Sequence, residues 1–288
     1  MQIYNFSLNT NHKTNVAKMQ QNTIALNFRG ALTAQRFDSF EKESPTRTFT
    51  LSHKVFEVNT FEPVEVTQNL NENVILYKKV FDKKTGTTRK IPFSAGVASS
   101  KNEYTTTYYF IDNKTKQELG FVAIDDWQLA QKLNKLPKFL LDSPLLDDFP
   151  ELGITKDRVN IGELQNNFEK SLSGIGEAAD QIAIEYCLKH GLTPNVVSVA
   201  ALNSHAAHYM RGRRFFEISK NDKDIDYYEF KKKYNTTNPN EIIEQRIKET
   251  PKENRIYTDD LGNLYMYMPK EIVAKYLKRI KQSPILID

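Results

Sequence analysis

Gly174 and Gly176 stand at the start of a stretch, 177–190, in which apolar residues recur at helical spacing. A helix that begins at a glycine turn exposes several main-chain N–H groups that have no intrahelical acceptor. Those donors and the positive end of the helix dipole suit a phosphate or pyrophosphate, and glycines leave room for it because they lack a Cβ atom. The turn therefore predicts an anion site, although the same glycines also fit a tight turn that binds nothing.

Glu163 is the candidate general base. It lies in the alternating stretch 159–164, which predicts a strand on which Glu163 shares a face with Ile161. Acyl transfer to an amine needs a proton acceptor, and a carboxylate acting directly or through water can serve. A surface glutamate at a strand edge is the alternative interpretation of this residue.

The elements around the turn predict a sheet covered by helices. The stretch 104–111 is rich in β-branched and aromatic residues, and the apolar run 119–124 follows it after a short polar turn. We expect one sheet with strands at 104–111, 119–125, 159–166, 195–201 and 214–219, and with helices 176–190 and 203–212 packed on it.

This order of elements resembles the GNAT acyltransferase superfamily over about 40% of the chain. The family's phosphate loop reads Arg/Gln-x-x-Gly-x-Gly/Ala at a strand-to-helix junction, and Gly174 and Gly176 match its two small positions. Asn203 and Ala206, after the strand, resemble the family's Asn-x-x-Ala entry to its last core helix. Phe215 falls where the family has the Phe of a Gly-Phe pair.

The resemblance implies an α+β fold of the GNAT-like three-layer α/β/α type, with a central mixed β-sheet. It implies acetyl-CoA as co-substrate and direct transfer of the acyl group to an amine that the sequence does not identify. Glu163 would be the catalytic base, and Tyr209 is the nearest candidate for the acid that protonates the departing thiolate. The residues implied to bind acetyl-CoA are Asn166, Phe168, Ser171, Leu172, Ser173, Gly174, Ile175, Gly176 and Asn203.

Several positions depart from the family pattern. Ser171 stands at the usual Arg/Gln position, with Lys170 one residue early, and Arg214 replaces the Gly of Gly-Phe. Met210 stands at the usual tyrosine position. Tyr209 is one residue away, a rotation of about 100° on a helix, so it would fill an adjacent core position. These departures favour the alternative that the chain is a catalytically inactive GNAT-like binding or structural protein.

Charge and composition limit the other partners. The chain has 40 basic and 36 acidic residues, interspersed, with a net charge of +4. A nucleic-acid binder usually gathers its positive charge on one face, so nucleic acid is an unlikely partner and only the basic C-terminal helices leave it open. The single cysteine, Cys187, excludes an intrachain disulfide and is expected to be buried. His205 and His208 have helical spacing but no third ligand beside them, so we expect no metal site.

Three regions differ in character. They are a poorly ordered polar leader (1–48), the acyl-CoA-binding domain (49–220, core 104–220), and a helical extension with a closing strand and helix (221–288). Residues 1 to about 45 of the leader are expected to be dispensable for folding. Within the second region, 74–81 and 87–91 predict a hairpin. Because no apolar run approaches the ~20 residues of a membrane span and the N-terminus does not resemble a signal peptide, we expect a cytoplasmic protein with no membrane partner.

Overall fold

The computed structural model describes residues 46–55, 60–136, 146–168, 171–200, 204–222, 225–250 and 261–286. Almost all of the predicted leader, 1–48, lies outside these ranges. Asn203, implied to bind acetyl-CoA, and Lys170 also lie outside them. Every helix within the described ranges is too short or too polar to cross a lipid bilayer.

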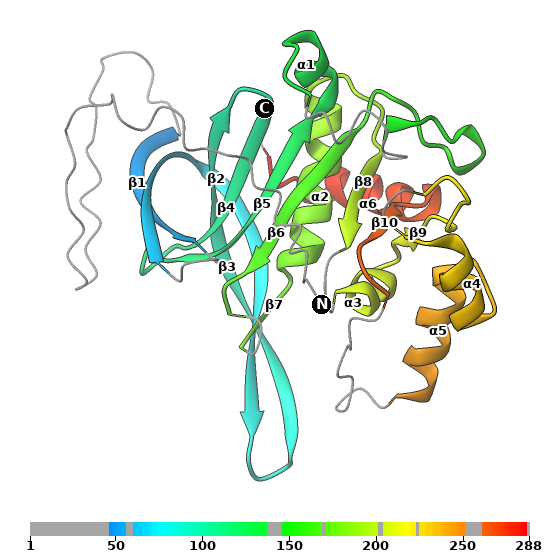
Figure 1. Cartoon of the computed structure of the whole chain (residues 1–288). Coiled ribbons are helices and arrows are strands. Elements are labelled where there is room, and N and C mark those ends of the chain that lie inside the picture. The colour runs from blue at the N-terminus through cyan, green and yellow to red at the C-terminus, as the bar shows by residue number, and fades with distance from the viewer. Residues whose placement is uncertain are drawn as a thin grey trace.

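One ten-stranded sheet forms the body of the protein (Figure 1). Its strands are β1 (Thr46–Val55), β2 (Thr60–Asp82), β3 (Thr87–Asn102), β4 (Thr105–Asp112), β5 (Glu118–Asp126), β6 (Val159–Asn166), β7 (Leu172–Ser173), β8 (Val196–Ala200), β9 (Arg214–Phe215) and β10 (Leu264–Tyr267). Their order across the sheet is β1-β2-β3-β4-β5-β6-β8-β10-β9, and β7 pairs with β2. The paired strands are antiparallel, except that β6 and β8 are parallel. The sheet is therefore mixed and mostly antiparallel, in an α+β fold.

The longer helices gather on one face of this sheet. The helices are α1 (Trp127–Lys132), the short 3-10 helix η4 (Pro150–Leu152), α2 (Ile175–Lys189), α3 (His205–Met210), α4 (Tyr227–Tyr234), α5 (Pro239–Glu249) and α6 (Lys270–Gln282). Buried side chains of α2 and α6 share one core with residues of β5, β6 and β8. On the other face, Trp127 of α1 and Ile154 pack against Val197 of β8.

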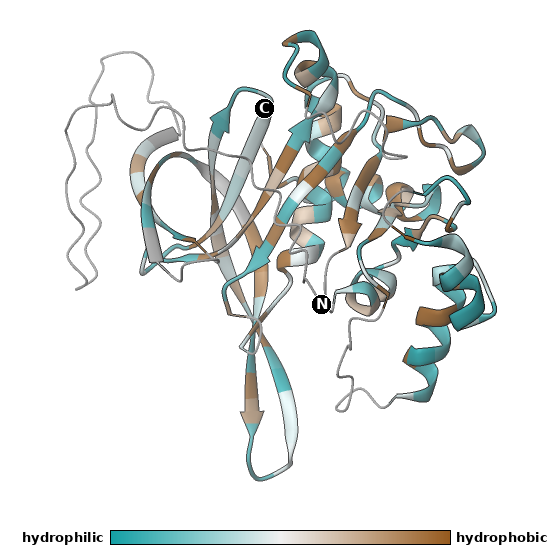
Figure 2. Ribbon diagram, in the orientation of Figure 1, coloured by the Kyte–Doolittle hydropathy of each residue, from teal (hydrophilic) through white to brown (hydrophobic). Residues whose placement is uncertain are grey.

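Helix α2 lies close to the strands because its inner side is small or apolar. Ala178, Ala179, Ile182 and Ala183 are fully buried, and Figure 2 shows apolar bands on the strands that α2 crosses. Small side chains allow a close approach between helix and sheet, which gives a densely packed core. Cys187 is buried in the same core as predicted, and burial raises the pKa of its thiol to about 12.

Most of the predicted elements are present. The predicted strands 104–111, 119–125, 159–166 and 195–201 correspond to β4, β5, β6 and β8, and the predicted helices 176–190 and 203–212 correspond to α2 and a shorter α3. The predicted strand 214–219 is only two residues long. It ends early because the main chain turns away from the sheet, and Ile218 N donates to Thr237 O at 2.9 Å.

The first five strands curl so that β1 returns to contact β5 (Figure 1). The inside of this curl is apolar, with Phe49 and Leu51 of β1 packed against Tyr109 of β4 and Phe121 of β5. The predicted hairpin of 74–81 and 87–91 is present, within the longer strands β2 and β3. Its outer end extends past the body as a two-stranded projection (Figure 1). The curl covers part of the sheet face that α2 leaves open.

Candidate functional site

Strand β6 leaves β8 part-way along the sheet. The two strands are paired only at Val159 with Val196, Asn160 with Val197 and Ile161 with Ser198. Strand β6 continues to Asn166 alongside β5, so residues 162–166 have a neighbouring strand on one side only among the described strands. The side of β6 that faces away from β5 therefore has no described strand beside it at 162–166.

A β-bulge lies where the two strands separate. Ile161 pairs with Ile124, but Glu163 pairs with Ala123, so Gly162 is the extra residue. The bulge puts Glu163 on the sheet face opposite to Ile161, which packs in the core beneath α2. The prediction that Glu163 and Ile161 share a face is therefore wrong, because strict alternation does not allow for an inserted residue. Glu163 is exposed on the face that α2 leaves open.

Asp125 is the carboxylate closest to the bulge. Its Oδ1 accepts a hydrogen bond from Thr105 Oγ1 at 2.7 Å, and its Oδ2 accepts one from Asn160 Nδ2 at 3.1 Å. A Cβ atom on Gly162 would overlap Asp125 Oδ2, so the glycine is what lets the carboxylate approach the bulge. Burial raises the pKa of Asp125, and this effect outweighs the opposing effect of the two hydrogen bonds.

A second polar group lies on the same open face. His53 Nδ1 lies 2.9 Å from Glu118 Oε2, and Asn167 Nδ2 donates to Glu118 Oε1 at 2.8 Å. The His53 ring packs edge-on against Tyr109 and Phe121, with centroids 5.4 and 4.7 Å apart. Burial and the nearby negative charge of Glu118 raise the pKa of Tyr109. This group lies on the sheet face opposite α2, beside the apolar inside of the curl, and Glu118, Tyr109 and Phe121 are buried there.

The glycine turn begins α2, as predicted. Gly174 is the N-cap residue and has a φ of 106°, a left-handed conformation that favours glycine. Ser171 is exposed, and its main-chain oxygen accepts a hydrogen bond from Lys79 N at 2.7 Å. Ser173, between them, has a buried hydroxyl with no hydrogen-bond partner among the described residues. The first turn of α2 therefore presents main-chain donors beside a small, rigid loop.

Other residues of the predicted acetyl-CoA site support the turn from inside. Leu172 and Ile175 are buried in the core beneath α2, so their side chains point away from solvent. Asn166 Oδ1 accepts from Phe168 N at 3.0 Å, and Asn166 Nδ2 donates to Leu172 O at 3.3 Å. Phe168 packs against the same core. These four side chains hold the shape of the loop.

A cation covers Gly176. A Cβ atom on Gly176 would lie 2.7 Å from Arg211 Cζ. Arg211 Nε lies 3.4 Å from Asp180 Oδ2, and Arg213 Nη2 lies 2.5 Å from Asp180 Oδ1. Arg211 Nη2 lies 2.7 Å from His208 Nδ1. Burial and the two arginines hold the pKa of His208 well below its usual range, so His208 is neutral and accepts this hydrogen bond.

Tyr209 lies away from the open face. Its hydroxyl donates to Glu244 Oε2 of α5 at 3.0 Å, and the Arg214 guanidinium lies 4.3 Å from the centre of its ring. It packs with the helices α3 and α5, in the adjacent core position that the one-residue offset predicts. Met210 is exposed. The structure therefore does not bring Tyr209 together with Glu163.

The two candidate metal ligands on α3 have other partners. His205 Nε2 lies 3.0 Å from Gly262 O, and His208 contacts Arg211. No group of three metal-binding side chains occurs in the part of the chain that the structure describes.

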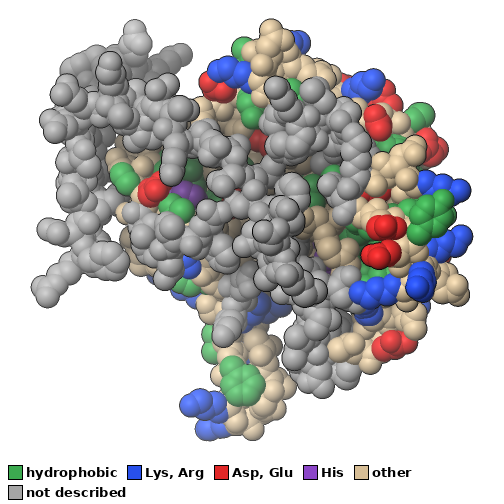
Figure 3. Space-filling model, in the orientation of Figure 1, with side chains coloured by type: hydrophobic (Ala, Val, Ile, Leu, Met, Phe, Trp, Pro, Cys, Tyr) green, Lys and Arg blue, Asp and Glu red, His purple; other side chains and the backbone are tan. Residues whose placement is uncertain are grey.

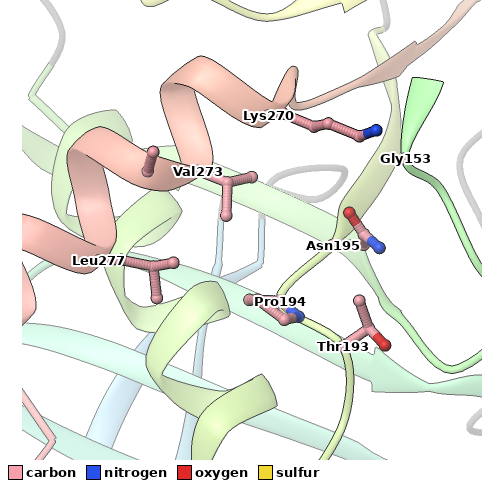
Figure 4. Close-up of a pocket in the computed structure, with 8 residues that line it drawn as sticks. Gly153, Thr193, Pro194, Asn195, Lys270, Val273 and Leu277 are labelled. Carbon is pink, nitrogen blue, oxygen red and sulfur yellow. The ribbon is translucent and has the colours of Figure 1, made fainter. Parts of the chain in front are cut away.

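A pocket of about 210 Å³ lies elsewhere, between the start of α6 and the loop before β8 (Figure 4). Val273 and Leu277 of α6 and Pro194 of the loop make its lining mostly apolar. Of its polar residues, Thr193 is hydrogen-bonded to Asp157 and Asn195 to Thr155. The pocket does not include the glycine turn or Asp125.

Comparison with protein-family models gives no match to this chain, and comparison with curated protein sequences gives none either. Sequence reasoning missed Asp125, Arg211 and the His53–Glu118 pair. Asp125 did carry a signal, because a carboxylate stands at the end of the apolar run 119–124. Arg211, His53 and Glu118 have no such signal, because strands and helices far apart in the sequence bring them to the site.

Proposed function

We propose that the protein is an acyl-CoA-dependent N-acyltransferase, with acetyl-CoA as the acyl donor. The observation that carries the proposal is the separation of β6 from β8 at Ile161, with the α2 turn beyond the end of β6. The side of residues 162–166 that faces away from β5 extends from the bulge toward this turn over roughly 15 Å, at about 3.3 Å per residue. An extended pantetheine arm fits along this path with its pyrophosphate at the turn.

The strand order supports a GNAT-like arrangement. From β3 to β6 the strands are antiparallel neighbours in chain order. The one parallel pair, β6 with β8, flanks the α2 crossover, and β10 lies between β8 and β9. In the three-layer arrangement that the resemblance implies, α2 and α6 would form one outer layer. The segment that includes α1 and η4, which covers Val197, would form the other.

Asp125 is the best placed proton acceptor. The acceptor amine attacks the thioester carbonyl carbon, the C–S bond breaks, and the thiolate leaves with its electron pair. The amine must lose one proton in this reaction, and Asp125 can take it up at the bulge. Because its pKa is raised, Asp125 is a stronger base than an exposed carboxylate such as Glu163. Main-chain N–H groups on the side of β6 that faces away from β5 would polarise the carbonyl.

One observation favours the alternative, a GNAT-like protein that binds without turnover. The Tyr209 hydroxyl is held by Glu244, and Met210 stands at the family's tyrosine position, so neither supplies an acid to the leaving thiolate. This alternative retains acyl-CoA binding at the turn and lacks acyl transfer.

Calorimetry with CoA and acetyl-CoA, together with thiol release from acetyl-CoA in the presence of a panel of primary amines, separates these possibilities. We expect binding and release for the enzyme, and Asp125→Asn should keep the binding while lowering the release at least about 100-fold. Glu163→Gln is the matched control and should have a smaller effect. Binding without release would support the non-catalytic protein, and no binding at millimolar CoA would refute both.

A further inference from the structure

The projection formed by β2 and β3 is a two-stranded arm, residues 78–92 (Figure 1). Its base is held by the body, since Lys78 pairs with Leu172 of β7 and Lys79 N donates to Ser171 O, and its outer part stands away from the body. Residues 79–82 pair with 87–90, and β3 regains its other neighbour, β4, only at Ala95. From the Lys78–Ile91 pair to the Asp82–Thr87 pair, the arm is roughly 14 Å long before its turn is added. Both faces of this ribbon are therefore available to a partner.

Positive charge is concentrated on the arm. Asp82 is its single acidic residue, and Asp82 Oδ2 lies 3.5 Å from Arg89. Lys79 and Lys90 are directly opposite each other in the pairing of the two strands. The basic residues of the arm are Lys78, Lys79, Lys83, Lys84, Arg89 and Lys90. A bound polyanion would reduce the electrostatic repulsion among these like charges.

Apolar side chains accompany these cations. Val80, Phe81 and Ile91 are 46%, 61% and 50% exposed, which is unusual for large apolar residues grouped within one short element. Figure 3 shows apolar and basic side chains next to each other at the projecting end of the molecule. A partner that contacts the arm must therefore accept apolar contacts as well as positive charge.

The distribution over the two faces indicates the kind of partner. Cross-strand partners share a face, so Lys78, Val80, Arg89 and Ile91 lie on one face. Lys79, Phe81 and Lys90 lie on the other. A membrane surface favours charges on one face and apolar residues on the opposite face, which is not what the arm has. The flat surface of an acidic protein would contact only one face and leave the other charged face unpaired.

We propose that the arm binds double-stranded DNA by lying in the major groove. A major groove about 12 Å wide and about 8.5 Å deep admits a two-stranded ribbon, and it places phosphates along both sides of that ribbon. Cations on both faces and at the turn contact those phosphates. Phe81, on the face turned toward the base pairs, contacts base edges and thymine methyl groups. This contact accounts for an exposed aromatic side chain that phosphate binding alone would not need.

Fluorescence anisotropy with a labelled 20-base-pair duplex at 50 mM salt tests the proposal in the full chain. If four of the six cations contact phosphates, affinity should fall roughly 100-fold between 50 mM and 200 mM salt. The triple variant Lys83→Ser, Lys84→Ser, Lys90→Ser should lose at least tenfold in affinity at 50 mM salt. The matched control, Lys231→Ser, Lys232→Ser, Lys233→Ser on α4, removes the same charge and should bind almost as the unmodified protein does. All six lysines are exposed, so both variants should fold.

The variant Phe81→Ala tests the groove geometry. It removes no charge, so it should weaken duplex binding while the salt dependence stays the same. Equal losses for the two triple variants would mean non-specific attraction and would overturn the proposal. So would the absence of duplex binding at 50 mM salt, or preferential binding to single-stranded RNA or to vesicles that contain phosphatidylserine.

Discussion

The carboxylate of Asp125 occupies the space that a side chain on Gly162 would need. The two residues lie on neighbouring strands, β5 and β6, at the bulge where β6 separates from β8. Gly162 thus leaves the space that the carboxylate occupies at the bulge. Any residue with a Cβ atom at 162 must displace Asp125 or alter the bulge.

We expect Gly162→Ala to lower the free energy of unfolding by about 1–3 kcal/mol, because the added methyl group overpacks the site. In the double variant Gly162→Ala, Asp125→Ala the overlap is gone, so most of that loss should be recovered relative to Asp125→Ala alone. Urea denaturation of the four proteins in a double-mutant cycle measures this coupling. Additive effects would mean that Asp125 and Gly162 do not constrain each other.

If the α2 turn binds CoA as proposed, Arg211 would supply the cation that Ser171 does not. We expect Arg211→Ala to weaken CoA binding about 10- to 100-fold, because a charged hydrogen bond to phosphate contributes about 1.5–3 kcal/mol. The loss should be smaller at high salt, which screens a partly exposed charge. Calorimetry with CoA at two salt concentrations measures both effects.

The control for Arg211 is Arg214→Ala, since Arg214 stacks on Tyr209 and does not lie over Gly176. Gly176→Val should resemble Arg211→Ala, because its side chain would push the guanidinium aside. Tighter CoA binding by Arg211→Ala would show that the arginine covers the turn and competes with the ligand.

Glu118 should contribute much more to stability than Glu163. Glu118→Ala leaves His53 and the amide of Asn167 without their acceptor, so we expect the free energy of unfolding to fall by about 2–3 kcal/mol. Glu163 is exposed, and Glu163→Ala should change the free energy of unfolding by less than about 0.5 kcal/mol. Thermal unfolding of the two variants makes the comparison, and equal shifts in Tm would contradict it.

His208 should make the protein less stable in acid. Its pKa is lowered in the folded state, so below about pH 6.5 the unfolded chain binds a proton that the folded chain does not. The free energy of unfolding should therefore fall with decreasing pH, by up to about 1.4 kcal/mol per pH unit from this residue. His208→Gln should show a shallower decline between pH 7 and pH 5 in denaturation experiments, and an unchanged decline would refute the assignment.

The elements with strong local patterns were predictable from the sequence. The run of small and apolar residues in 177–190 specified α2, and the β-branched stretch 104–111 specified β4. The face of Glu163 was not predictable, because a bulge depends on the register of two strands and leaves no local pattern. The site residues Asp125 and Arg211 could not be paired with Gly162 and Gly176, because those contacts join segments that only the tertiary fold brings together.

The curl of β1 to β5 also affects how the chain can fold. Consecutive strands from β2 to β5 are joined by turns of a few residues, so their ladders close with little loss of chain entropy. Strands β6 and β8 can pair only after the glycine turn and α2, which lie between them in the sequence, have formed. In pulse-labelling hydrogen exchange, amides of β3, β4 and β5 should therefore be protected before those of β8. Strand β6, which carries the bulge, would then lie at the boundary between the half of the protein that folds early and the half that folds late.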